Sequence, residues 1–136
     1  MKRYMNLSLL YTVLGLAGGV FYREFTKFNG FTGKTVLAVV HTHYLVLGML
    51  FFLLLLILEK NFAFTGERTE RKIILYNAGL NVTALVFLVK GIIQTMGTEL
   101  SSTLSSVISG VAGIGHILLG VTLVLIILDV RKGVSD

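Results

Sequence analysis

Four long apolar runs, almost free of charged residues, constrain this chain more than any other feature of its sequence. Each run approaches or exceeds the roughly 20 residues that a helix needs to cross a bilayer core. Only 14% of the 136 residues are charged, which is too few for a soluble domain of this size. We therefore predict an all-α fold, an integral membrane four-helix bundle with up-down-up-down topology. It forms a single transmembrane domain over residues 1–136, with spans at about 4–22, 35–58, 73–96 and 104–128.

The basic residues between the spans predict the orientation of the bundle. One side carries Lys2, Arg3, Lys60, Arg68, Arg71, Lys72, Arg131 and Lys132. The other side carries only Arg23, Lys27 and Lys34. Because cytoplasmic segments carry the excess of Lys and Arg, we expect both termini in the cytoplasm. This asymmetry accounts for the net charge of +5 without nucleic-acid binding.

A few polar side chains lie inside the spans, where lipid makes them costly. They are His41, His43, Lys90, Gln94 and His116, and they include every histidine of the chain. Counted along the helices, they lie in the outer half of the membrane or near its midplane. Ionisable groups at such depth indicate function. The structural alternatives are hydrogen bonding between helices for the histidines and, for Lys90, an ammonium group that reaches the interface.

Helix geometry limits what the histidines can bind together. His41 and His43 point some 160° apart on a regular helix, so both cannot bind one metal ion from the same helix. Zinc sites on helices prefer an i, i+4 spacing, which argues against a three-histidine zinc site. Gly113 and Gly120 lie three and four residues from His116, and we expect them to leave an open slot beside its imidazole.

These positions favour a b-type haem between the second and fourth spans, bound by two histidines. His116 supplies one ligand, and either His41 or His43 supplies the other. Gly48 lies seven residues after His41 and shares its face, which favours His41 as the histidine that faces the core. The chain has no cysteine, so covalent c-type attachment is excluded.

Four cations are candidates to bind the haem propionates. Arg23, Lys27 and Lys34 are expected at the outer surface, within reach of propionates directed outward. Lys90 is an alternative counter-charge for a propionate or another anionic ligand. The complete set of candidate cofactor-binding residues is therefore His41, His43, His116, Arg23, Lys27, Lys34, Lys90, Gly48, Gly113 and Gly120, with the three histidines as candidate metal ligands.

Two resemblances add to these expectations. Residues 41–48, HTHYLVLG, look like the H-x-H-L-x-x-x-G stretch of short relatives of haem-copper oxidase subunit I and of some nitric-oxide-response membrane proteins. In oxidase-type proteins a histidine at such a position is an axial haem ligand, and a distant helix supplies its partner. The whole chain also resembles a family of small four-span bacterial membrane proteins without an assigned function, with FYREFTKFNGFTG at 21–33 as its other recognisable segment.

The leading hypothesis is a membrane-embedded b-type haem-binding protein, used for electron transfer or for sensing haem or a gas. The alternatives are a small transporter or channel component for protons or metal ions, and a structural or assembly subunit of a membrane complex. We expect no stand-alone enzyme, although a redox role remains open. The expected partners are the bilayer of the bacterial inner membrane and haem, with a homo-oligomer left open and no nucleic acid.

Overall fold

The computed structural model describes residues 1–135, and these form helices joined by short segments. Helix α1 spans Lys2–Phe28, α4 spans Glu67–Thr95 and α5 spans Ser102–Ser135. Between α1 and α4 lies one continuous rod built from η1 (Val36–Val39), α2 (Val40–His43), η2 (Tyr44–Leu50) and α3 (Phe51–Phe62). We call this the second rod. No strand occurs among the described residues.

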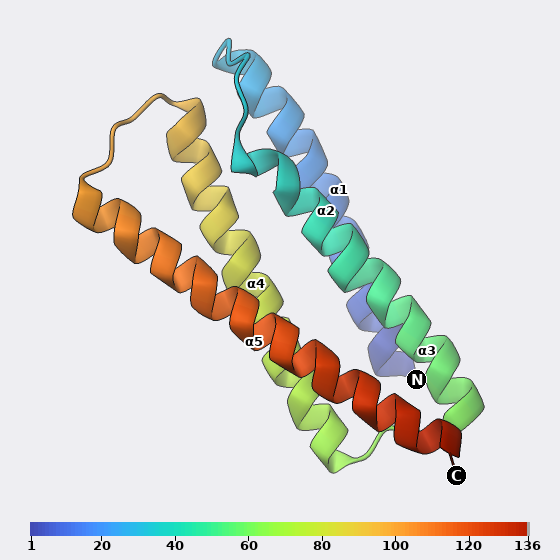
Figure 1. Cartoon of the computed structure of the whole chain (residues 1–136). Coiled ribbons are helices and arrows are strands. Elements are labelled where there is room, and N and C mark those ends of the chain that lie inside the picture. Colours follow the sequence, from blue (N-terminus) through green and yellow to red (C-terminus); the bar gives the residue numbers. More distant parts are fainter. Residues whose placement is uncertain (136) are drawn as a thin grey trace.

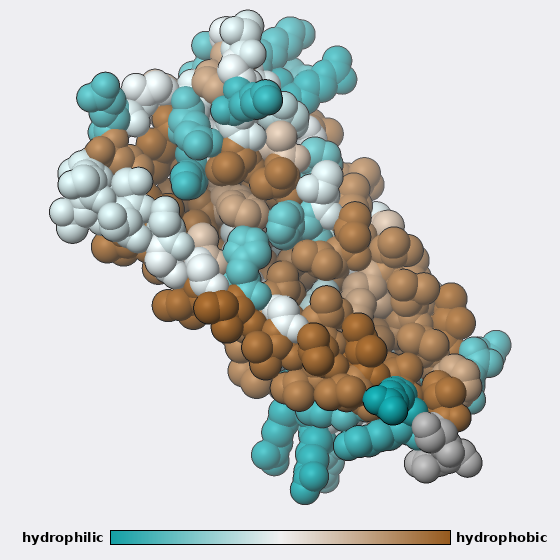
Figure 2. All heavy atoms as spheres, in the orientation of Figure 1, coloured by the Kyte–Doolittle hydropathy of each residue, from teal (hydrophilic) through white to brown (hydrophobic). Residues whose placement is uncertain are grey.

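The prediction of a four-helix membrane fold is confirmed. Helices α1, α4 and α5 and the second rod are each long and apolar enough to cross a membrane. Consecutive helices run antiparallel, so the N-terminus and the end of α5 lie at the same end of the molecule (Figure 1). We call this the termini end, and the opposite end, which holds segments 29–35 and 96–101, the loop end. Figure 2 shows hydrophilic side chains concentrated at these two ends with a broad hydrophobic surface between them.

Aromatic rings fill the contact between α1 and the second rod. Tyr11 stacks on Tyr44, with ring centroids 5.6 Å apart, and on Phe52 at 5.8 Å. The Tyr11 hydroxyl donates to Asn77 Oδ1 on α4 and accepts from Asn81 Nδ2 at 3.0 Å. Since lipid offers no hydrogen-bond partners, this internal network holds α1 and α4 together at mid-membrane depth.

The middle of the second rod is a π-helix, Tyr44–Leu50. The chain contains no proline, so proline is not the cause of this irregularity. Two hydroxyls from neighbouring helices donate to carbonyls of this segment, Tyr76 to Leu47 O at 2.7 Å and Ser8 to Met49 O at 3.0 Å. These tertiary bonds support a backbone whose own i→i+5 bonds are weaker than those of an α-helix.

Helix α5 packs mainly against α4, through glycines that bring the two backbones together. A Cβ on Gly79 would lie 2.7 Å from the backbone nitrogen of Leu119. Near the termini end, the Lys72 ammonium pairs with the Asp129 carboxylate at 2.6 Å, and both side chains are largely buried. Thr69 donates a further bond to Asp129 at 2.9 Å, so this end of α5 is firmly held.

The start of the second rod is fastened to the loop end of α4. The Val36 backbone N–H donates to Gln94 Oε1 at 2.9 Å, and the Thr35 hydroxyl donates to Gly91 O at 3.1 Å. Gly91 permits this approach, because a Cβ there would lie 2.6 Å from the backbone nitrogen of Leu37. The junction therefore fixes where the histidines that follow on α2 stand relative to α4.

Candidate functional site

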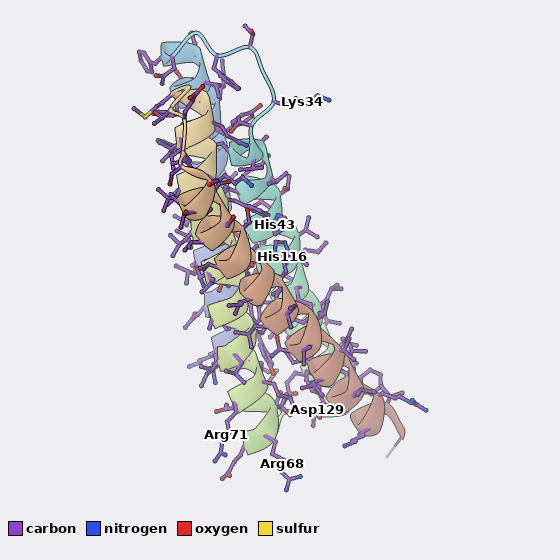
Figure 3. The ribbon with its side chains drawn as sticks, turned by 60° about the vertical axis from the view of Figure 1, so that its left-hand side comes forward. Lys34, His43, Arg68, Arg71, His116 and Asp129 are labelled. Atoms are coloured by element: carbon purple, nitrogen blue, oxygen red, sulfur yellow. The ribbon has the colours of Figure 1, made fainter. Side chains whose placement is uncertain are left out.

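Two histidines from different helices face each other in the half of the molecule nearer the loop end. The rings of His43, on α2, and His116, on α5, have centroids 6.0 Å apart and lie nearly perpendicular, at 88°. Figure 3 shows the two side chains meeting between these helices. A metal held at about 2 Å by each of two imidazole nitrogens on opposite sides would require those nitrogens about 4 Å apart.

The backbone sets the same tautomer in both histidines. His43 Nδ1 lies 2.9 Å from Val39 O, and His116 Nδ1 lies 2.8 Å from Ala112 O, in each case one turn earlier on the same helix. A carbonyl oxygen can only accept, so Nδ1 carries the proton in each ring. The Nε2 lone pair of each imidazole is therefore left available, which is the usual state of a metal-binding histidine with a fixed orientation.

Phe87 on α4 completes the cluster, and the sequence analysis missed it. Its ring lies 5.1 Å from that of His43 and 5.4 Å from that of His116, measured between centroids. The only signal available in the sequence was its place three residues before Lys90, on the same helix face. We call the cluster of His43, Phe87 and His116 the histidine site.

The surroundings of the histidine site are open. Thr42, His43, Val46 and Leu47 line a hollow of about 300 Å³ on the second rod. On α5, a Cβ at Gly113 or at Gly120 would meet no atom within 4 Å, and His116 itself is exposed. The surface of α5 beside His116 is therefore open, and the predicted slot stays a prediction.

The structure corrects the choice between the two histidines of the second rod. His41 faces α1, where its ring is 6.3 Å from that of Tyr22 and its side chain lies against Gly18 and Gly19. Its Nδ1 is buried without a hydrogen-bond partner among the described residues. The expectation that His41 is the histidine paired with His116 is therefore wrong, because His43 occupies that position.

Gly48 explains this error. It lies on the side of the second rod that packs on α1, and a Cβ there would collide with the side chain of Tyr11. The sequence correctly placed Gly48 and His41 on a common side, but that side meets α1 instead of α5. Gly48 serves the close approach of two helices, the usual role of small residues in membrane bundles, and takes no part in the histidine site.

Three of the proposed propionate partners do not surround the histidine site. Arg23 is on α1, with its Nε 3.6 Å from the neighbouring Glu24 carboxylate, and Lys27 is exposed near the end of the same helix. Helix α1 packs mainly against the second rod, whereas His116 is on α5. Lys34 extends from segment 29–35 away from the bundle (Figure 3).

Lys90 is the cation that α4 brings toward the histidine site. It is half-buried and lies between Phe87, which touches both imidazoles, and Gln94, which binds Val36. Residues three and four apart share a helix face, so Lys90 projects on the side of α4 that carries these contacts.

The described residues contain no group of three or more His, Asp or Glu side chains placed to hold a metal ion. The three candidate metal ligands thus divide into a pair, His43 and His116, and a separate residue, His41. Two nitrogen ligands on opposing helices do not form a closed structural zinc site, which takes four ligands. Two histidines suit a metal-containing cofactor that supplies the other ligands of its own metal ion.

Fold and site together define a class: a small multi-pass helical membrane protein with a pair of opposed histidines between two of its spans. The chain belongs to the family described as "Protein of unknown function (DUF2871)", whose model matches residues 1–133. This agrees with the predicted kinship to a family without an assigned function. No curated protein and no solved structure matches the chain, and the resemblance to haem-copper oxidase relatives gains no support from these comparisons.

Proposed function

We propose that this chain binds a b-type haem within the membrane through His43 and His116 and serves in electron transfer. The observation that carries the proposal is the opposed pair of imidazoles, each with its Nδ1 proton donated to a backbone carbonyl and its Nε2 free. A porphyrin supplies four nitrogen ligands of its own, so two protein ligands suffice. Haem bound in this way supplies one-electron chemistry.

The surroundings of the two histidines fit such a group. A flat macrocycle needs small residues beside its ligands, and Gly113 and Gly120 leave open space on both sides of His116 along α5. Phe87 and the apolar side chains Val46 and Leu47 offer a hydrophobic environment. Two imidazoles leave no open position on the iron, which favours electron transfer over the binding of a gas.

We also propose a place and an orientation, the bacterial inner membrane with both termini in the cytoplasm. The excess of Lys and Arg at the termini end supports this orientation. The histidine site then lies in the outer half of the membrane, on the side from which electrons reach or leave an extracytoplasmic partner.

The test is the absorbance spectrum of protein purified in detergent from cells well supplied with haem. We expect a Soret band, with sharp α and β bands after reduction, and their loss in His43→Ala and in His116→Ala. His41→Ala is the matched control, since His41 faces α1, and it should keep the haem. A colourless wild-type protein would refute the proposal, as would variants at 43 and 116 that keep full haem.

Imidazole rescue separates a lost ligand from a damaged fold. In His116→Gly, free imidazole should restore the α band, because it can occupy the space that the side chain leaves. Carbon monoxide should leave the spectrum of reduced wild-type protein unchanged, since His43 and His116 would both hold the haem iron. If carbon monoxide bound to the wild-type protein, gas binding and not electron transfer would be the function of the site.

A second candidate function, a subunit of a larger membrane complex, is favoured by one face of α5. Ser106, Ser109 and Gly110 are exposed there, and a Cβ on Gly110 would meet nothing within 4 Å. Small residues of this kind let helices approach closely in lipid. Gly110→Leu should then release the chain from its complex in mild-detergent native electrophoresis while leaving the haem spectrum intact.

A further inference from the structure

Lys90 is a positive charge inside a membrane-spanning helix, three residues from the centre of the histidine site. It lies about 4.5 Å beyond Phe87 along the axis of α4, toward the loop end, at 1.5 Å of rise per residue. Placing a lysine at such depth is costly, and the ammonium group needs either a partner or a path to water.

In the part of the chain that the structure describes, no carboxylate pairs with this lysine. Among the described residues, Lys90 takes part in no ion pair, whereas Lys72 is fully paired with Asp129 near the termini end. The carboxylates nearest the loop end are those of Glu24, which pairs with Arg23, and of Glu99, in the exposed segment 96–101. With no ion pair among the described residues, the ammonium of Lys90 is available to an anionic ligand.

The position of Lys90 along α4 matches the needs of a ligand with one apolar and one anionic edge. Phe87 marks the level of the two imidazoles, and Lys90 is one turn nearer the loop end on the same face of α4. A carboxylate at the edge of a flat ligand centred between His43 and His116 would meet the ammonium there, in a charge-assisted hydrogen bond. The apolar edge would then point toward mid-membrane.

We propose that Lys90 binds the carboxylates of the planar ligand held by His43 and His116 and so sets its direction, with the anionic edge toward the loop end. The inference rests on the proposed function and deepens it, because it assigns the propionate-binding role to Lys90 and away from Arg23, Lys27 and Lys34. It also defines the ligand class, a metal-binding macrocycle that carries carboxylates.

The experiment compares haem b with its dimethyl ester, in which both carboxylates are blocked, on apo-protein titrated in detergent. In Lys90→Gln the dissociation constant for haem b should rise about tenfold or more, as expected for a lost charge-assisted bond. In the same variant, the dissociation constant for the dimethyl ester should change less than about twofold. Lys90→Arg should bind both pigments nearly as the wild-type protein does. Lys27→Gln, a surface lysine on α1, is the control and should affect neither.

The outcomes are distinct. If Lys90→Gln weakened haem b and the ester equally, the lysine would only support the fold, and the inference would be wrong while haem binding stood. Retained ester binding in Lys90→Gln shows that this variant is folded. If the wild-type protein bound neither pigment, the proposed function would fail, and the role of Lys90 with it.

Discussion

At the scale of single residues, glycines that look equivalent in the sequence have opposite roles. Gly79 lies where the backbones of α4 and α5 cross, and a Cβ there would lie 2.7 Å from Leu119 N and 3.1 Å from Gly115 O. At Gly110 the same atom would meet nothing within 4 Å. Backbone atoms cannot move aside as a flexible side chain can, so the two positions should respond differently to the same substitution.

Gly79→Ala should therefore destabilise the protein by about 1–3 kcal/mol, the usual cost of overpacking a tight contact. Gly110→Ala should be neutral or should stabilise by up to about 1 kcal/mol, because alanine is the better helix former. Equilibrium unfolding in mixed detergent micelles measures both changes in free energy. Equal effects of the two substitutions would show that α4 and α5 do not approach as closely as described.

At the scale of elements, we infer that the π-helix Tyr44–Leu50 contributes to which histidine reaches α5. It lies directly after His43, so its wider turns set the angle between α2 and α3. One residue of helix corresponds to about 100° of rotation. A regular α-helix in its place would turn His43 away from α5 if the contacts of α3 stayed as they are.

Deleting Val46, an exposed residue of the π-helix, should therefore separate the two imidazole positions. The chain lacks cysteine, so a His43→Cys/His116→Cys pair can be joined selectively by a short bis-maleimide. We expect efficient cross-linking in the full-length chain and a several-fold lower yield after the deletion, with helix content by circular dichroism retained. A His41→Cys/His116→Cys pair should cross-link poorly in both backgrounds, and an unchanged yield after the deletion would argue against this role of the π-helix.

At the scale of the whole molecule, most basic residues and the histidine site lie in opposite halves. The basic residues outside the spans gather at the termini end, whereas the histidine site lies in the other half, below the loop end. The structure shows that the N-terminus and the end of α5 lie at one end (Figure 1). The orientation that we propose rests on the larger number of Lys and Arg residues at that end.

Single cysteines test this orientation. Thr32→Cys, in segment 29–35, should react with a membrane-impermeant maleimide in intact spheroplasts. Glu67→Cys, at the start of α4, should react only after the membrane is opened. Both positions are exposed, so accessibility within the protein does not distinguish them. The reverse pattern of labelling would place the histidine site in the inner half of the membrane.

The sequence by itself determined the fold class and the number of spans. The thickness of the hydrocarbon core dictates how many apolar residues a span needs. The lengths of the apolar runs were therefore sufficient to predict four spans, at 4–22, 35–58, 73–96 and 104–128. It also determined that His41 and His43 lie on different sides of one helix and that Gly113 and Gly120 flank His116, because helix periodicity is a local property.

Only the tertiary structure decided which helix each of these faces meets. Gly48 and His41 share a side of the second rod, and that side packs on Tyr11 and its helix α1. His43, on another side, is therefore the histidine that contacts His116. The place of Phe87 against both imidazoles depends equally on how α4 meets α2 and α5. Periodicity defines directions around one helix axis, whereas the neighbour in each direction depends on close contacts between backbones far apart in the sequence.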